Sequence, residues 1–491
     1  MNSSDIVSLM PLIIIAAAAI VIMMIAAIRR SHALTVIVAL TALAFAINSL
    51  VHFSVNLPYR ISPMFIIDRY AVLFMALIFI AGFALTILSY GYLKRLKINR
   101  EEYYLLLLLA TLGAAVLIIS QHFISLFLGL EILGVSLYTL ISYIVDREKG
   151  TEAGIKYLIL AASASGFLLF GMALVYYDCG TMSFDKLSEM FTSGRQNVVA
   201  FTGIALMIVG IGFKLAVAPF HMWTADVYEG APAPVTAFIA TVSKGSMFAL
   251  ILRFFININM DQYRTLFLIF AVISILSMFA GNLLALMQTN IKRILAYSSI
   301  AHLGYLLIGF LAGREIGMTA VVFYLFAYFI TIIGAFAIIS LIPSEDGEAV
   351  DLQAYRGLYW SHPWLSVALT AMMLSLAGIP LTAGFIAKFY ILIAGLKAVL
   401  WLPVVILVVN SALGVYYYLR IIMSMFSKQP EEAPGIGILR YAVPIGSGIL
   451  IAILLIVLIW AGVFPGRLID IIQSFVLDHT QAGALTFNIF P

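Results

Sequence analysis

Long apolar runs dominate the chain, and short polar segments separate them at regular intervals. A run of about 18 or more apolar residues is long enough to cross the hydrocarbon core of a bilayer as an α-helix. The sequence therefore predicts an all-α polytopic membrane protein of about fourteen transmembrane helices. The predicted spans are residues 6–28, 33–53, 70–93, 103–120, 122–145, 155–177, 198–228, 231–255, 263–287, 292–312, 316–342, 362–396, 399–425 and 441–464, with a polar loop at 178–197.

Two of these spans contain helix-breaking residues. Pro219 lies inside residues 198–228, and its missing N–H bends or ends a helix. Gly and Pro residues interrupt 362–396 in the same way, and broken helices persist in a membrane only where protein or water satisfies the freed backbone groups. The residues that weaken this second span are Gly378, Pro380 and Gly384.

The two broken spans occupy matching places in the chain, because each is the fourth span of a five-span block. Paired interruptions of this kind indicate inverted repeats with a site near the middle of the bilayer. We therefore expect three N-terminal helices in 1–102, a first antiporter-like repeat in 103–257, a second in 258–427, and helix 14 with a tail in 428–491.

Charged residues inside the spans are the candidate functional groups. Four of them are lysines and one is a glutamate, Glu131, and the lysines are Lys156, Lys214, Lys244 and Lys388. An ammonium that is kept away from water can lose its proton, whereas a guanidinium effectively cannot. The choice of lysine therefore favours a proton relay, in which Glu131 would hold Lys214 charged and then release it.

Each of these residues also has a structural interpretation. Lys156 lies near the end of its span, where a long side chain can reach the membrane surface. A buried ammonium at Lys214, Lys244 or Lys388 could simply donate to backbone carbonyls or pin helices together. His221 and His302 could join a relay or could be hydrogen-bonded packing residues.

Four further charged residues are expected to act locally at the inner membrane surface. Lys292 and Arg293 begin the tenth predicted span and are interpreted as surface anchors. Asp226 and Glu229 end the first broken span and are expected to cap a helix or to pair with nearby cations.

Composition and charge narrow the class of protein. The 491 residues are 64% hydrophobic and 10% charged, whereas soluble domains carry about 25% charged residues. The single cysteine, Cys179, rules out a disulfide framework or a cysteine-held iron–sulfur cluster within the chain. No nucleotide, flavin or metal motif and no basic stripe for nucleic acid is present, so we expect no cofactor or metal in this chain. The distribution of Lys and Arg favours an N-terminus on the outer, periplasmic side.

Three long motifs resemble a known family. They are FKLAVAPFHMWTADVYEGAPAPV at 213–235, QTNIKRILAYSSIAHLGYLL at 288–307 and MLSLAGIPLTAGFIAKFYIL at 373–392. These motifs resemble subunit N of bacterial respiratory complex I, the proton-pumping NADH:quinone oxidoreductase, and its mitochondrial counterpart, subunit 2. The resemblance runs over nearly the whole chain.

The resemblance implies a fourteen-span antiporter-like subunit whose charged axis relays protons. The family's axis falls here on Glu131, Lys156, Lys214, Lys244 and Lys388, and His221 and His302 match relay positions less closely. The related subunit M has a glutamate at the place of Lys388, and subunits L and M and sodium/proton antiporter subunits carry a histidine near Ala240. Subunit L also has a long C-terminal extension that this chain lacks. One departure is Ala225, where the family often has proline, so the sequence leaves open whether a sharp helix stop precedes Asp226.

The resemblance also implies partners and a driving force. FMN, iron–sulfur clusters and quinone would lie in partner subunits, and this chain would sit among other membrane-arm subunits, including antiporter-like ones, in the bacterial cytoplasmic (inner) membrane. Redox chemistry elsewhere would shift the charge state around Glu131 and so drive the relay. Two other functions remain open at this stage: a cation/proton antiporter without redox coupling, and a scaffold whose buried charges only hold helices together.

Overall fold

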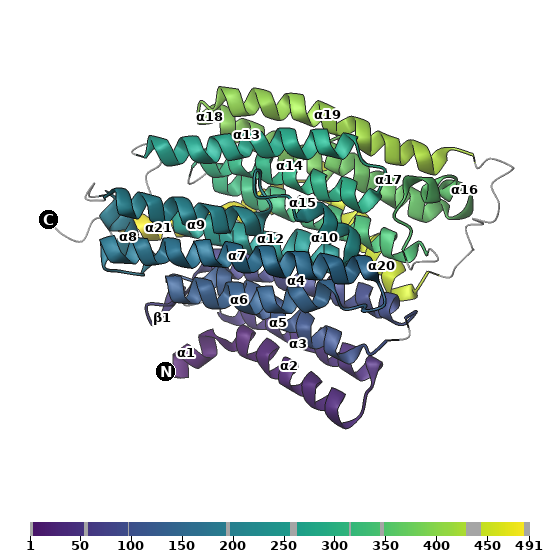
Figure 1. Ribbon diagram of the computed structural model, residues 1–491, viewed down its shortest axis with the longest axis horizontal. Helices are drawn as coiled ribbons and strands as arrows, with labels where there is room; N and C mark the ends of the chain where they lie inside the picture. The colour runs from purple at the N-terminus through teal and green to yellow at the C-terminus, as the bar shows by residue number, and fades with distance from the viewer. Residues whose placement is uncertain are drawn as a thin grey trace.

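The computed structural model describes residues 3–53, 57–96, 98–192, 197–255, 263–313, 316–343, 348–428 and 443–485. Most of the helices run side by side, from α2 at one edge of the molecule to α19 at the other (Figure 1). The helices are α1 Ser3–Ser8, α2 Met10–Ile28, α3 His32–Phe53, α4 Arg69–Leu93, α5 Glu101–Ile119, α6 Phe123–Ile141, α7 Glu148–Cys179, α8 Phe184–Thr192, α9 Val198–Leu215, α10 Thr224–Gly230, α11 Ala233–Phe238, the π-helix η2 Ile239–Ser243, α12 Lys244–Phe255, α13 Arg264–Leu286, α14 Ile291–Leu311, α15 Ile316–Leu341, the 3₁₀-helix η3 Leu352–Tyr355, α16 Leu358–Ser361, α17 Pro363–Ala377, α18 Ala383–Lys397, α19 Trp401–Phe426, α20 Ile445–Val463 and α21 Gly466–Leu485. A short antiparallel hairpin joins β1 Tyr59–Ile61 to β2 Phe65–Ile67.

The predicted all-α membrane fold is confirmed. Within the described residues, 13 helices or continuous helical segments are long and apolar enough to span a bilayer. The remaining predicted span, 362–396, is present as the shorter pair α17 and α18. Two details differ from expectation, because the polar loop at 178–197 contains the short helix α8 and the C-terminal tail contains α21.

Three spans form the interior of the molecule. The most apolar window of Ala233–Phe255 is completely buried, and those of α14 and α15 are 94% buried. The corresponding windows of α2 and α19, at the two edges of the molecule, are only 33% and 39% buried (Figure 1). The segment that carries Lys244 therefore lies among other helices and away from the surrounding lipid.

Both predicted helix breaks are present. Helix α9 ends at Leu215, where Ala216 adopts a left-handed backbone with φ 61°, and α10 starts only at Thr224. Helix α17 ends at Ala377, followed by Gly378 with φ 83°. Helix α10 runs through Ala225 and Asp226, so no helix stop separates these two residues.

A close glycine contact sets the place of the first broken span. Gly171 on α7 faces Gly203 on α9, and a Cβ atom added to Gly171 would come within 2.5 Å of the Gly203 carbonyl oxygen. Small residues allow helices in a membrane to approach each other closely in this way. The contact holds the helix that carries Lys214 against α7.

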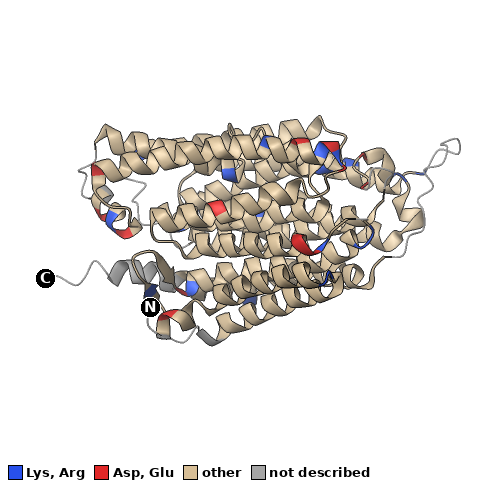
Figure 2. Cartoon of the chain, turned by 60° about the horizontal axis from the view of Figure 1, so that its bottom comes forward, with Lys and Arg blue, Asp and Glu red and all other residues tan. Residues whose placement is uncertain are grey.

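Charged side chains gather toward the ends of the helices. Figure 2 shows few blue or red segments in the middle of the helix layer. An ionised group in the middle of a bilayer is costly, so the few charges found there mark candidate functional positions.

Candidate functional site

Lys214 occupies the last turn of α9, directly before the first helix break. The residue is 9% exposed, and its Nζ atom lies 5.7 Å from the ring centre of Tyr157 and 5.9 Å from that of Tyr138. Aromatic rings stabilise an ammonium at these distances through their negative faces. The protein satisfies backbone groups at the break, since Ser277 Oγ accepts the Ala218 N–H and the Phe213 carbonyl accepts the indole N–H of the nearby tryptophan.

Glu131 lies on α6 near Lys214 but does not contact it. Its Oε1 atom accepts a hydrogen bond of 2.9 Å from Ser165 on α7. Among the described residues no ion pair within 4.0 Å joins Glu131 to Lys214, so the expected pairing is a longer-range electrostatic one. A shift of charge at Glu131 would still be felt at Lys214, because electrostatic interactions reach beyond contact distance and Lys214 is buried.

A small cavity lies next to Lys214, on the side toward Lys244. Its lining includes Lys214, Tyr157 and Ser243, the residue that precedes Lys244. The cavity has room for a water molecule, and polar side chains in its wall could hold one.

Lys244 lies at the start of α12, directly after the π-helical turn η2. The residue is 1% exposed and its Nζ atom donates a hydrogen bond of 2.7 Å to Ser299 on α14. The same ammonium lies 5.2 Å from the ring centre of Tyr228, whose hydroxyl is 3.3 Å from Ser299 Oγ. π-helical turns occur often at functional sites, where they change which residues face a partner.

A row of polar side chains leads along α14 away from Lys244. Ser298, beside Ser299, is hydrogen-bonded to the Tyr418 hydroxyl at 2.5 Å. The same hydroxyl lies 3.1 Å from His302 Nε2, and His302 Nδ1 lies 2.5 Å from the Tyr324 hydroxyl. The serine and tyrosine hydroxyls can each donate and accept a hydrogen bond. A neutral histidine donates through one ring nitrogen and accepts through the other.

Lys388 lies at the second helix break. Its Nζ atom donates to the Ala377 carbonyl at the end of α17, at 2.8 Å, and to Ser411 Oγ at 3.0 Å. A second cavity with room for a water molecule lies between His302 and this break, and Ala387 lines it. Lys388 therefore donates to a backbone carbonyl at the helix break, which is the structural role that the sequence left open. It also lies at the end of the polar row.

Lys156 and His221 lie apart from this row. The Lys156 side chain is 45% exposed and pairs with Asp226 at 2.9 Å and with Glu152 at 2.6 Å. His221 is buried between α9 and α10, and its Nδ1 atom has no hydrogen-bond partner among the described residues. The structure thus does not bring either residue into hydrogen-bond contact with Lys214 or Lys244.

The expected local roles of Asp226 and Glu229 are confirmed. Asp226 pairs with Arg293 at 2.9 Å as well as with Lys156. Glu229 pairs with Arg293 at 2.9 Å and with Lys149 at 2.8 Å.

Lys292 differs from expectation, because it is buried and is not a surface anchor. Its side chain is 1% exposed and its Nζ atom lies 2.9 Å from Glu348, whose side chain is 2% exposed. Ser299, Tyr324 and Tyr418 also lie in the polar row, although nothing in the sequence marks them as candidate relay residues. A lone serine or tyrosine in an apolar span carries no sequence signal of its own, since only the partner across the fold gives it a role.

Comparisons with known proteins decide the family. The family model described as NADH:quinone oxidoreductase/Mrp antiporter, TM, matches residues 120–414. NADH-quinone oxidoreductase subunit N of Methylococcus capsulatus is 43% identical over 474 residues, which are 96% of this chain and 95% of that protein. Its counterpart in Ectopseudomonas mendocina is 42% identical over 96% of this chain and 97% of its own length. The chain belongs to the subunit N family of NADH-quinone oxidoreductases.

Solved structures of membrane complexes share the fold of this chain. A chain of respiratory complex I from Thermus thermophilus, determined with bound aureothin, superposes with a TM-score of 0.80 at 32% identity and covers 94% of this chain and 98% of its own. A chain of the Mrp complex from Dietzia sp. DQ12-45-1b has a TM-score of 0.83 at 22% identity, with 97% of both chains covered, and this likeness concerns the fold alone. The resemblance seen in the sequence motifs is therefore confirmed.

Proposed function

We propose that this chain is a proton-translocating subunit in the membrane arm of a respiratory NADH:quinone oxidoreductase. It would sit among other membrane-arm subunits in the bacterial cytoplasmic membrane, with its N-terminus on the periplasmic side. Electron transfer through FMN, iron–sulfur clusters and quinone would take place in partner subunits. Membership of the subunit N family supports this assignment over a redox-independent cation/proton antiporter.

The observation that carries the proposal is the polar line between the two helix breaks. It begins at Lys214, continues at Lys244 with its hydrogen bond to Ser299, and ends beyond His302 at Lys388. One water-sized cavity lies on each side of Lys244 along this line, one next to Lys214 and one next to His302.

In the proposed mechanism a change of charge near Glu131 alters the proton affinity of Lys214. At an effective dielectric of about 20, a unit charge about 4 Å from an ammonium changes its energy by about 4 kcal/mol, which corresponds to roughly three pH units in its titration. The proton then passes by way of water to Lys244, and through Ser299 and the His302–Tyr418 pair toward Lys388.

Lys156 and His221 have a different proposed place. Lys156 lies among Asp226 and Glu152 at the exposed end of the first broken span, where it could take part in proton exchange with the aqueous phase. His221 could do the same from within the break. Neither lies on the polar line between the two helix breaks, so we expect their replacement to have smaller effects than replacement of Lys214 or Lys244.

The test uses the whole complex in membrane vesicles. Lys244→Met removes the titrating group and keeps the side chain unbranched, and Lys214→Arg keeps the positive charge but cannot release its proton. Both variants should keep NADH oxidation with an artificial electron acceptor and lose proton pumping. Normal pumping by assembled Lys244→Met complex would refute the relay, and co-purification without flavin- and iron–sulfur-containing subunits would favour the antiporter.

A further inference from the structure

The chain is interrupted a second time between α10 and α11, at Pro232. Helix α10 ends at Gly230 and α11 begins at Ala233, with Pro232 extended at φ −54° and ψ 141°. An interruption of this kind frees backbone groups on both sides, the carbonyl of Ala231 and the N–H of Ala233. These groups lie at the membrane-surface end of the span that carries Lys244, away from bulk water, so the protein itself must satisfy them.

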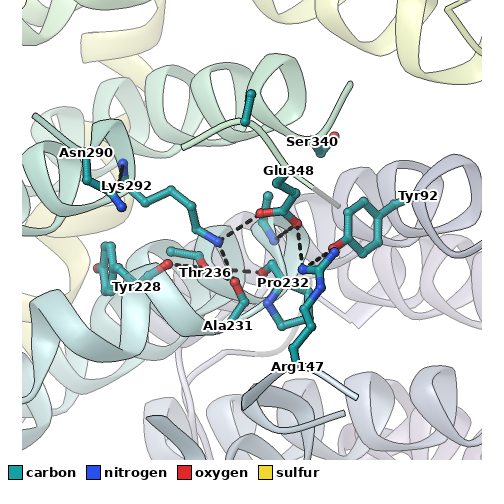
Figure 3. Close-up of polar contacts among 12 residues, drawn as sticks. Tyr92, Arg147, Tyr228, Ala231, Pro232, Thr236, Asn290, Lys292, Ser340 and Glu348 are labelled. Atoms are coloured by element: carbon teal, nitrogen blue, oxygen red, sulfur yellow. Dashed lines mark hydrogen bonds and ion pairs between the residues drawn. The ribbon is translucent and has the colours of Figure 1, made fainter. Parts of the chain in front are cut away.

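Two charged side chains satisfy these groups and also bind each other. Lys292 Nζ donates to the Ala231 carbonyl at 2.6 Å, and Glu348 Oε1 accepts the Ala233 N–H at 2.9 Å. Lys292 Nζ and Glu348 Oε2 lie 2.9 Å apart (Figure 3). We call Lys292 and Glu348 the break-point ion pair.

The two signs of charge match the two ends of the interrupted helix. A helix carries partial negative charge at its C-terminus and partial positive charge at its N-terminus. The ammonium of Lys292 lies at the C-terminal end of α10, and the carboxylate of Glu348 lies at the N-terminal end of α11. Exchange of the two charges would place like beside like at both ends.

Helix α14 connects the break-point ion pair to Lys244. Lys292 and Ser299 lie seven residues apart on α14, which is two turns or roughly 10 Å along one face. Lys292 contacts the start of the Lys244-bearing span, and Ser299 accepts the hydrogen bond from Lys244 itself. One rigid helix therefore sets both contacts with the same span.

The other end of that span is also held by a buried ion pair. Arg253, near the end of α12, donates two hydrogen bonds to Asp68, at 2.8 and 2.9 Å. Lys244 thus lies on a segment that is fixed at both ends, at Ala233 by Glu348 and at Arg253 by Asp68. A segment held in this way keeps its side chains in one register against α14.

We propose that the break-point ion pair positions Lys244 for proton transfer by holding the interrupted span in register with Ser299. Glu348 and Lys292 are positioning residues in this proposal, since neither lies on the line between Lys214 and Lys388. The inference rests on the proposed proton-relay function and adds to it the part that sets the geometry of its central lysine.

The proposal is tested with Glu348→Gln, Glu348→Asp and the apolar double variant Lys292→Met with Glu348→Leu. Apolar replacement of a whole buried ion pair is often tolerated in folding, whereas loss of one partner is strongly destabilising. The double variant should therefore assemble and still leave the break without its hydrogen bonds. The rate of proton pumping, at equal amounts of assembled complex, should fall by about fivefold, the factor in rate that corresponds to the loss of one hydrogen bond. The protons pumped per NADH oxidised should fall with it. The pH profile of pumping should move as well, because Lys244 is no longer held in register with Ser299.

A charge-exchanged variant separates positioning from simple ion pairing. Lys292→Glu with Glu348→Lys keeps an ion pair but puts a carboxylate against the Ala231 carbonyl and an ammonium beside the Ala233 N–H and Arg147. It should pump as poorly as the other variants. The matched control is Arg30→Met with Glu102→Gln, which removes an exposed ion pair of 2.7 Å that bonds to neither Ala231 nor Ala233, and it should pump normally.

Several results would overturn the proposal. One is a parental proton-to-NADH ratio in the apolar double variant or in the charge-exchanged variant. If the other variants fail to assemble, Glu348→Asp is the deciding one. It keeps the negative charge, but its side chain is too short to reach both the Ala233 N–H and Lys292, so a parental ratio in this variant would also overturn the proposal. Loss of pumping in Lys244→Met together with parental ratios in all Glu348 variants would refute this inference alone, whereas normal pumping in Lys244→Met would refute the relay.

Discussion

The Lys244 ammonium donates a hydrogen bond of 2.7 Å to Ser299, and both residues are almost fully buried. This contact joins the two halves of the protein, because Lys244 follows the first broken span and Ser299 lies on α14 in the second predicted repeat. The division of the chain into repeats at 103–257 and 258–427 remains a prediction, and this hydrogen bond lies where the two would meet.

Ser299→Ala tests the importance of that contact. The substitution leaves the buried Lys244 ammonium without its hydroxyl partner, which costs about 1–3 kcal/mol. We expect slower proton pumping, measured as fluorescence quenching of a pH-sensitive dye in vesicles, with electron transfer to an artificial acceptor retained. Ser163→Ala, on the exposed face of α7, is the control and should behave as the parent. Unchanged pumping in Ser299→Ala would remove the hydroxyl from the relay.

Tyr418→Phe tests the link between Ser298 and His302. The substitution keeps the ring and removes the hydroxyl that contacts both residues. Loss of about 1 kcal/mol of hydrogen bonding corresponds to roughly a fivefold slower step. Tyr416→Phe, on an exposed part of α19, is the matched control. Equal pumping rates in the two variants would show that protons bypass Tyr418.

Gly378→Ala tests the support of Lys388 at the second helix break. A Cβ atom there would lie 2.7 Å from Lys388 Cδ, and the backbone has φ 83°. Gly313 has a similar backbone, with φ 93°, but nothing lies within 4 Å of its added Cβ atom. Both variants should lose about 1 kcal/mol of stability from backbone strain, and only Gly378→Ala should also lose proton pumping. Similar pumping in the two variants would mean that the position of Lys388 is not critical.

Gly171→Val tests the close approach of α7 to α9. The added side chain would collide with the Gly203 carbonyl, and forced overpacking costs typically about 1–3 kcal/mol. We expect a lower melting temperature of the purified complex and less assembled subunit. Gly166→Ala, on the same helix with open space around its Cβ atom, should be neutral or slightly stabilising. A melting temperature for Gly171→Val equal to that of Gly166→Ala would contradict the close contact.

Low pH should reduce the stability of the folded protein through protonation of Glu348, which lies in the connection between α15 and η3. Burial acts to raise the pKa of this carboxyl group, but favourable contacts outweigh it and lower the pKa below 4.5; they come from Lys292, Tyr92, the Ala233 N–H and Arg147. A group whose pKa is lower in the folded state stabilises it fully above the unfolded pKa, and this contribution disappears as the pH falls through the folded pKa.

The measurement is thermal unfolding in detergent between neutral pH and about pH 3, where the carboxyl group of an ordinary glutamate takes up its proton. The parent should lose more stability over this range than the apolar double variant Lys292→Met with Glu348→Leu, which has no charge to titrate there. Identical pH dependence in the two proteins would show that Glu348 does not titrate differently on folding.

The spans and their breaks could be predicted because their signals are local. An apolar run of sufficient length and a proline or glycine inside it are visible within about 20 residues, and Lys214, Lys244 and Lys388 stand out because each interrupts such a run. The structure places these three residues in the interior, as expected. Their roles as proton carriers remain predictions.

The partners could not be predicted because they come from distant parts of the chain. Lys292 begins a span, so its position favoured the membrane surface, and its burial depends on Glu348, 56 residues away. Lys156 looked equally suited to relay or surface, and its ion pair with Asp226 spans 70 residues. The local sequence pattern around a residue does not indicate which residue 50 or more positions away will contact it in the fold.

The surroundings of Glu348 extend beyond the two predicted repeats. Tyr92, near the end of α4, hydrogen-bonds to Glu348, and Arg147 donates to the Tyr92 hydroxyl at 3.1 Å. The first three predicted spans hold no candidate proton carrier. The third of them, α4, nevertheless contributes the Tyr92 hydroxyl, which bonds to Glu348, and Glu348 accepts the Ala233 N–H at the start of α11. A related protein without these N-terminal helices would therefore need another hydrogen-bond donor beside the residue equivalent to Glu348. Whether such a donor is present would show whether the N-terminal helices do more than anchor the subunit in the membrane.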